Sequence, residues 1–415
     1  MEPGAHDASG APGLGVEHVT APHAPLSGGP ILGAPASAGA ASVGAARARV
    51  DQSELMVRRA LLVAAGAAAL TAVLAGLGRF GIAIGWGPSY AAVHGPLFVL
   101  AVFGTVISLE RAVAVAHWWS LAAPGAVAVG AVAMLAGLDW APWAALVGAL
   151  ALVAVNIAIV VRQPAPFTWL MLLGSAVLVY GNAHWALGVP VFEVVHAWMA
   201  FFVLTIVAER LEMSRLTPTP RSAARALVVV AVAFAVVSCG AITIVDVAHR
   251  LLGGILVLIA LWQLRFDLAR RTVRQRGLPR FTAIGVLAAA LWLLVVGVLM
   301  IALPMPPAGP IYDAELHGVF LGYVLSMVFA HAPIILPSVA RVRLPYHPVL
   351  LVSLVVMHAS VLVRVLGDLL GSGALREAGA VGNALSLAGF VGAVLWARAR
   401  VRPIAASATT SGATP

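Results

Sequence analysis

The segment from His317 to Pro337, HGVFLGYVLSMVFAHAPIILP, is apolar over a length that can cross a bilayer, yet it carries two histidines. His317 and His331 are 14 residues apart. On a helix this spacing is about four turns and roughly 21 Å of rise, so both rings point to nearly the same face. A ring nitrogen in hydrocarbon needs a polar side chain, a water, a metal or a haem iron as partner. That face is therefore predicted to point into the protein.

The composition extends this prediction to the whole chain. Apolar residues make up 61% and charged residues 10% of the sequence, and the mean hydropathy is +1.00. These values predict an all-α, polytopic membrane protein. All 25 basic residues are arginine, and a net charge of +9 is expected from arginines retained on the cytoplasmic side of a membrane. We therefore expect the lipid bilayer, and no nucleic acid, as a partner. The single cysteine, Cys239, excludes an internal disulfide.

Apolar runs separated by charged residues, proline and glycine predict about twelve transmembrane helices. They cover residues 58–81, 94–115, 118–137, 141–161, 166–187, 190–210, 224–245, 247–267, 281–304, 311–336, 346–369 and 375–398. Residues 1–55 are rich in glycine, alanine, proline and serine, so they are predicted to form a disordered tail. The sequence thus divides into this tail, a transmembrane domain at 56–400 and a second disordered tail at 401–415.

Arginine placement predicts the orientation of these helices. Arginines precede the first span and follow spans two, four, six, eight, ten and twelve, whereas the alternate loops carry mostly Asp and Glu. The positive-inside rule then places both termini in the cytoplasm. The expected location is a bacterial inner membrane, crossed several times.

Histidines recur at the predicted outer ends of the spans. Spans two, six and ten each begin with a histidine and a small residue, namely His94-Gly95, His196-Ala197 and His317-Gly318. This recurrence every four helices indicates three four-helix arcs. His184 lies across a short loop from His196, and His358 lies in span eleven, so the outer half is predicted to be rich in imidazole.

The predicted inner ends carry two acid–base neighbours, Glu110-Arg111 and Glu209-Arg210. Adjacent helical residues point about 100° apart, so the glutamate of one helix is expected to pair with the arginine of another. We interpret these four residues as structural ion pairs, and a proton relay is the functional alternative.

The twelve spans, the three outer histidines and the three arcs resemble the catalytic subunit of the haem-copper oxidase superfamily. They are more closely similar to its NnrS-type relatives, haem- and copper-containing membrane proteins associated with nitric oxide. The resemblance covers residues of about 58 to 400, and its most similar segments are HGVFLGYVLSMVFAHAP and MHASVLVRVLGDL. It implies that His94 and His317 ligate haem and that His196 belongs to a copper site. A small gas or a redox partner is expected, in nitric oxide or respiratory redox metabolism.

Departures from the oxidase pattern narrow this expectation. Span seven, ARALVVVAVAFAVVSCGAITIV, has no histidine, and Ala200 stands where an oxidase has a tyrosine. Oxygen reduction is therefore not expected, and a single b-type haem is favoured over copper. The glycines after His94 and His317 would let a flat macrocycle approach both backbones. Beyond these two histidines, the candidate cofactor-binding residues are His196, His184 and His358, and the candidate metal ligands are His94, His317 and His196.

Other interpretations remain open. Each outer histidine alone can be an interfacial residue that reaches water or headgroups. Two haems could stack between spans ten and eleven, held by His317, His331, His347 and His358. A secondary transporter of a small solute also fits twelve spans with intramembrane Glu and Arg. The last alternative is a membrane scaffold without a cofactor, and no enzymatic activity is assigned.

Overall fold

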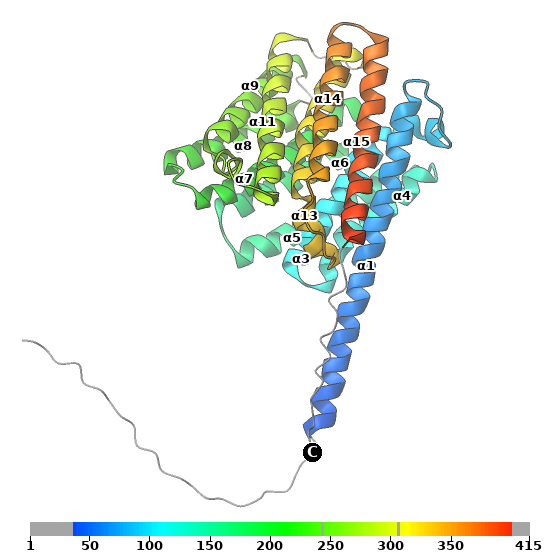
Figure 1. Cartoon of the computed structure of the whole chain (residues 1–415), viewed down its shortest axis with the longest axis vertical. Helices are drawn as coiled ribbons and strands as arrows, with labels where there is room; N and C mark the ends of the chain where they lie inside the picture. The colour runs from blue at the N-terminus through cyan, green and yellow to red at the C-terminus, as the bar shows by residue number, and fades with distance from the viewer. Residues whose placement is uncertain (1–35, 242–244, 305–307, 401–415) are drawn as a thin grey trace, which may run out of the picture. The chain divides into compact units, whose positions relative to one another are not determined.

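The computed structural model describes residues 36–241, 245–304 and 308–400, which contain helices and no strand. By their contacts, residues 51–415 form one compact unit and residues 1–50 another, of which the helical stretch 36–50 is described. Twelve helices among the described residues are long and apolar enough to span a membrane (Figure 1). The prediction of an all-α, polytopic membrane protein is thereby confirmed.

The first six spans are built as follows. Span one is α1 (Ala36–Gly78), and span two consists of η1 (Gly87–Val93), α2 (His94–Pro96), η2 (Leu97–Gly104) and α3 (Thr105–Val115). Span three joins η3 (Trp118–Leu121) to α4 (Ala122–Leu135). Then come α5 (Ala141–Arg162), α6 (Pro166–Ala186) and α7 (Val191–Met213), which η4 (Ser214–Leu216) extends.

The last six spans begin with α8 (Arg221–Gly240) and α9 (Val245–Phe266). The short helix α10 (Ala269–Thr272) connects α9 to α11 (Leu278–Ala302). Span ten consists of α12 (Pro310–His317), η5 (Gly318–Leu325) and α13 (Ser326–Ala340), and spans eleven and twelve are α14 (Val349–Leu369) and α15 (Gly373–Ala399). Helices α14 and α15 pack side by side, as do α9 and α11, and α6 contacts both α5 and α7 (Figure 1).

One predicted boundary is wrong. Helix α1 begins at Ala36, so residues 36–55 are helical where a disordered tail was predicted. The stretch is rich in alanine, the residue with the highest helix propensity, and this propensity outweighs its glycine and serine content. Residues 1–35 and 401–415, in the two predicted tails, lie outside the described residues.

Helix α7 forms the centre of the bundle. Every residue from 194 to 208 is buried, and a helix that is apolar all round is expected to be covered on all sides. Helix α6 approaches it closely, because a Cβ atom built on Gly181 would lie 2.9 Å from the Cβ of Ala197. Valines and leucines on outer helices such as α5 and α9 are exposed instead, as expected for surfaces that face lipid.

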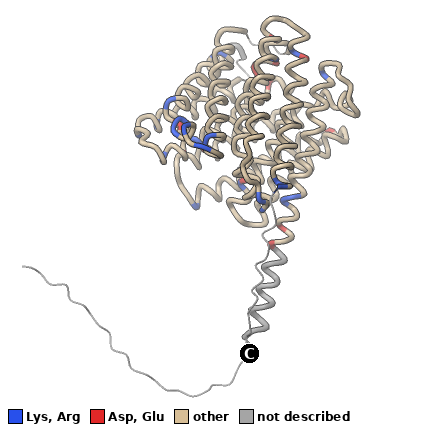
Figure 2. The backbone as a smooth tube through the Cα atoms, in the orientation of Figure 1, with Lys and Arg blue, Asp and Glu red and all other residues tan. Residues whose placement is uncertain are grey.

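Charged residues lie mostly near helix ends, and arginines gather around the connection from α9 to α11 (Figure 2). The membrane that the chain crosses, the cytoplasmic termini and the three four-helix arcs stay predictions.

Two spans share an unusual local geometry. The π-helical segment η2 begins three residues after His94, and η5 begins directly after His317. A π-helix is wider than an α-helix, is rare, and occurs frequently at functional sites. The two predicted haem ligands therefore precede the two π-helical segments of the described residues.

Candidate cofactor site

A cavity of about 530 Å³ lies among residues of α1, span two, α7, span ten, α14 and α15. Its volume is within the range of small-molecule and cofactor sites, roughly 300–1,000 Å³. Apolar side chains such as Phe98, Val195 and Phe320 form much of its wall. Its polar residues include the two predicted haem ligands, together with Tyr312, Asp313 and three arginines.

His94 and His317 meet at this cavity although 223 positions separate them in the sequence. Their ring centroids are 6.3 Å apart, and the ring planes are inclined by 16°. The structure thus brings together the two histidines that were predicted to share one cofactor.

Hydrogen bonds determine which nitrogen of each ring is free. The Nδ1 atom of His94 lies 2.6 Å from the carbonyl oxygen of Ala72, and Nδ1 of His317 lies 2.9 Å from that of Asp313. Because a carbonyl oxygen only accepts hydrogen bonds, each Nδ1 must carry the proton and donate. In a neutral ring, Nε2 is then the atom with a lone pair, and neither Nε2 has a hydrogen-bond partner among the described residues.

Ionic contacts that run from Arg364 through Asp313 hold the His317 ring in position. The Oδ1 atom of Asp313 lies 3.2 Å from Nδ1 of His317. Arg364 of α14 donates to both carboxylate oxygens of Asp313, from Nε at 2.7 Å and from Nη2 at 2.8 Å. Such a bidentate pair fixes the carboxylate, and the carboxylate in turn fixes the orientation of the imidazole ring. Phe80 lies beneath both Arg364 and Arg376, with its ring centroid 5.0 and 5.5 Å from their Cζ atoms.

Glycine supports His94 instead. A Cβ atom built on Gly76 of α1 would lie 2.7 Å from Cε1 of the His94 ring. Any other residue at this position would therefore displace the ring. Gly76 was not among the predicted site residues, because a glycine in an apolar helix carries no signal of what it packs against. The two predicted glycines differ: Gly95 faces open space in the cavity wall, whereas Gly318 packs on Val296 of α11. Close approach to the backbone is thus available at Gly95 and not at Gly318.

His196 lies in a second, fully buried cluster. Its ring centroid is 6.4 Å from that of His249, whose Nε2 atom is 3.3 Å from Oε1 of Glu315. Both nitrogens of His249, Nδ1 of His196 and Oε1 of Glu315 are buried without a hydrogen bond. His249 and Glu315 were not among the predicted site residues, because spacing along the chain does not show that α9 and α12 bury them together. Across the described residues, no group of three His, Cys, Asp or Glu could hold a metal ion, and the copper role of His196 stays a prediction.

The structure does not bring His184 or His358 to the cavity. Nδ1 of His184 bonds the carbonyl oxygen of Tyr180 at 2.9 Å, and the ring packs on the tyrosine ring at 4.2 Å. Nδ1 of His358 accepts from Nε1 of Trp292 at 3.0 Å, and its Nε2 lies 3.2 Å from Oγ of Ser326. Because both nitrogens of His358 are engaged, this ring has no free lone pair for a metal.

The two-haem interpretation is not supported by the other histidines either. His331 bonds the carbonyl oxygen of Met327 through Nδ1 at 2.8 Å, and its Nε2 accepts from Arg210 at 3.1 Å. His347 is exposed outside the helices, where its Nδ1 accepts from the backbone N–H of Val349 at 3.2 Å.

The inner acid–base residues form the expected pair between helices. Nη2 of Arg111 lies 2.7 Å from Oε1 of Glu209, and also 3.1 Å from Oε1 of its neighbour Glu110. The long arginine side chain therefore spans the 100° between adjacent positions, and this contact with Glu110 was not predicted. Arg210 departs from the prediction, because its partner is the imidazole of His331 and not a glutamate.

One family model, described as Domain of unknown function (DUF8744), matches residues 58–399, which include both histidines of the cavity and most of the described bundle. No curated protein matches the chain.

Proposed function

The chain belongs to the DUF8744 family, and we propose that it is an integral membrane haem protein in which His94 and His317 hold one b-type haem. The observation that carries this proposal is the pair of imidazoles at one cavity, each with Nδ1 bonded to a carbonyl and Nε2 free. Histidine ligands of metals commonly donate their other N–H in this way, which fixes the tautomer.

The spacing of the two rings fits a shared metal. His94 and His317 would each bind such a metal through the free Nε2 atom, so the two rings must lie close together. The observed centroid distance is 6.3 Å. Ring centroids of aromatic pairs also lie roughly 4.5–7 Å apart, so the free Nε2 atoms, and not the distance alone, support a shared metal.

The lining of the cavity fits the rest of the group. A b-type haem has a flat apolar face and two carboxylates, and the cavity combines apolar walls with three arginines. Arg364 is already bound to Asp313, whereas Arg79 donates to the carbonyl oxygen of Ala91 at 3.3 Å. Arg376 is paired with Asp368 at 2.5 Å, and this single contact leaves other N–H donors of its guanidinium available.

When bound, a b-type haem supplies one-electron oxidation and reduction. The residues of the chain bind and orient it: the Nδ1–H groups donate to Ala72 and Asp313, which raises the basicity of each Nε2. Because His94 and His317 would both bind the haem iron through Nε2, we propose electron transfer to a redox partner as the activity. The link to nitric oxide rests on the family resemblance alone.

One observation favours a second candidate, a transporter of a small anion. The cavity contains three arginines, and interrupted helices next to a cavity are typical of substrate sites in secondary transporters. Such a protein would be colourless.

The test is the absorption spectrum of detergent-purified protein, oxidised and reduced, after expression with ample haem. We expect a haem band in the wild type and its loss in His94→Ala and in His317→Ala. His184→Ala is the matched control, because Nδ1 of His184 also bonds the carbonyl four residues earlier, outside the cavity. A colourless wild type would contradict the haem proposal and favour the transporter.

A further inference from the structure

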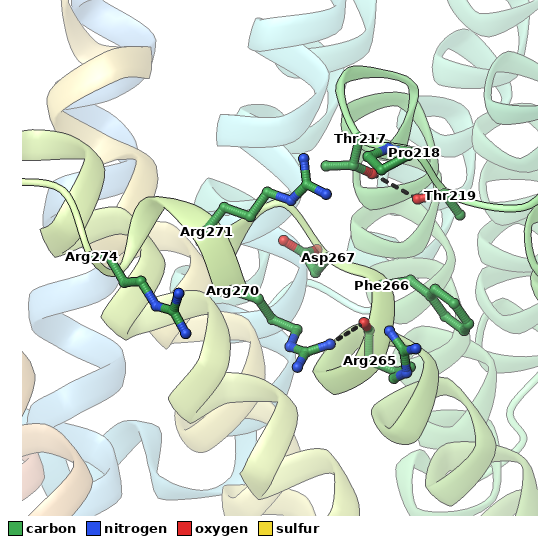
Figure 3. A pocket seen from close by; sticks show the side chains of 9 residues that line it. All are labelled: Thr217, Pro218, Thr219, Arg265, Phe266, Asp267, Arg270, Arg271 and Arg274. Atoms are coloured by element: carbon green, nitrogen blue, oxygen red, sulfur yellow. Dashed lines mark hydrogen bonds between the residues drawn. The ribbon is translucent and has the colours of Figure 1, made fainter.

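A second cavity, of about 460 Å³, lies where the turn after α7 meets the connection between α9 and α11 (Figure 3). Four arginines and two threonines contribute to its lining, namely Arg265, Arg270, Arg271, Arg274, Thr217 and Thr219. This pocket shares no lining residue with the cavity of His94 and His317.

The four arginines have no acidic partner. Among the described residues, none of them forms an ion pair with a carboxylate, and Arg270 donates only to the backbone carbonyl of Arg265 at 2.6 Å. Arginine pairs readily with carboxylates, and pairs of this kind occur elsewhere in this chain. Four like charges around one hollow attract an anion, and the guanidinium fork fits a phosphate group best.

A buried acceptor lies among these cations. Asp267 is 2% exposed, its Oδ1 accepts from the backbone N–H of Ala269 at 2.8 Å, and its Oδ2 has no hydrogen-bond partner. Figure 3 shows the carboxylate between the side chains of Arg270 and Arg271. An unpaired buried acceptor needs a donor, and the arginines do not supply one within ion-pair distance.

We propose that this pocket binds a phosphate ester that also carries a hydroxyl group, as a glycerol phosphate does. The arginines donate to the phosphate oxygens, with the threonine hydroxyls as further donors, and the ligand's hydroxyl donates to Oδ2 of Asp267. Charge and hydrogen bonding are then both satisfied, since the phosphate balances the arginines and the hydroxyl balances the aspartate.

The surroundings favour a lipid as the source of this group. Leu258 and Leu261 lie on the last turns of α9 before the pocket, and they are 53% and 49% exposed. Leu216, beside Thr217, is 67% exposed. Acyl chains could lie on these side chains while the headgroup reaches the arginines, and basic pockets at the ends of transmembrane helices bind anionic headgroups. The free phosphate ester is the other source.

Native mass spectrometry of the full chain in neutral detergent tests the proposal, with phosphatidylglycerol, phosphatidic acid and phosphatidylcholine as probes. We expect phosphatidylglycerol to bind tightest. Arg271→Gln should weaken its binding about five- to tenfold, as expected for one arginine near a lipid phosphate. Asp267→Asn keeps an oxygen for the N–H of Ala269 and should abolish the preference for phosphatidylglycerol over phosphatidic acid, which lacks the headgroup hydroxyls.

Arg276→Gln is the matched control, because it removes the same charge from the same connection without altering the pocket lining. Equal weakening by Arg271→Gln and Arg276→Gln would mean that net charge alone attracts the lipid. This result would contradict the proposal that the pocket binds it. Equal binding of phosphatidylcholine would overturn it as well. If glycerol 3-phosphate displaces phosphatidylglycerol and loses affinity in Arg271→Gln, the pocket stands and its ligand is soluble. If glycerol 3-phosphate does not displace phosphatidylglycerol, the ligand of the pocket is the lipid.

Discussion

The cavity of His94 and His317 and the inner cluster around Arg111 both place polar groups inside the bundle, but they differ in how these groups are satisfied. In the cluster around Arg111, this arginine contacts Glu110 and Glu209, and His331 accepts from Arg210, although Nε of each arginine has no hydrogen bond. At the cavity, Nδ1 of each histidine is bonded and Nε2 is free.

This difference separates structural polar groups from functional ones. A polar group inside a membrane is costly, so its neighbours or a ligand must satisfy it. Where side chains satisfy one another, the cluster holds helices together. Where an unsatisfied atom lies on a cavity, the missing partner is expected to be a ligand. The inner cluster should therefore affect stability and the cavity should affect binding.

The largest expected effect is at Gly76. A Cβ atom in Gly76→Ala would press on the His94 ring at 2.7 Å, so the ring must move and Nε2 loses its position. We expect severalfold less bound haem, measured as haem absorbance per protein, with a small change in thermal stability. Gly66→Ala on the same helix is the control, because nothing lies within 4 Å of a Cβ built there. Equal haem content in both variants would contradict the role of Gly76.

The next largest effect is expected in the inner cluster. Glu209→Gln removes the carboxylate closest to Arg111 and should lower the free energy of unfolding by about 1–3 kcal/mol, because a partly buried arginine loses an ionic partner. The haem spectrum should not change. Thermal melting in detergent measures the effect, and Glu377→Gln on the exposed side of α15 is the control. Normal stability with lost electron transfer would instead favour a proton relay.

The sequence predicted the spans well and the contacts between them poorly. Hydropathy located all twelve helices, because a segment in lipid must satisfy its backbone internally and must be apolar over a fixed length. The pairing of His94 with His317 came from histidine placement and the family resemblance, and the structure brings these residues together. Spacing along the chain could not show which side chains neighbouring helices present. Gly76, His249, Glu315 and the engaged nitrogens of His358 were therefore missed.

A smaller effect is expected at Asp313, which contacts Nδ1 of His317 and is not itself a proposed metal ligand. Asp313→Asn removes the negative charge beside Nδ1 of His317 and leaves Arg364 uncompensated. Both changes disfavour the oxidised, more positive metal centre, so the reduction potential should rise by tens of millivolts while haem is retained. A redox titration measures it, with Glu377→Gln as the control. An unchanged potential would show that the carboxylate is only structural.

The smallest effect concerns pH and compares Asp267 with the glutamates that contact Arg111. Burial raises the pKa of Asp267 above its ordinary value of 3.8, and Arg210 and the N–H of Ala269 only partly oppose this shift. A carboxyl with a raised pKa in the folded state holds its proton at a pH where the unfolded chain has lost it. Folding is then favoured at low pH, and this contribution is lost as the pH rises from about 4 through the raised pKa.

The melting temperature of the wild type should therefore fall over this interval relative to that of Asp267→Asn, which has no proton to lose. Phosphatidylglycerol should reduce the wild-type slope, because the proposed hydroxyl donor stabilises the ionised carboxylate. Parallel pH profiles for the two proteins without lipid would show that Asp267 is as satisfied as the glutamates that contact Arg111. The unpaired Oδ2 atom would then have a donor, such as water, that makes a ligand unnecessary.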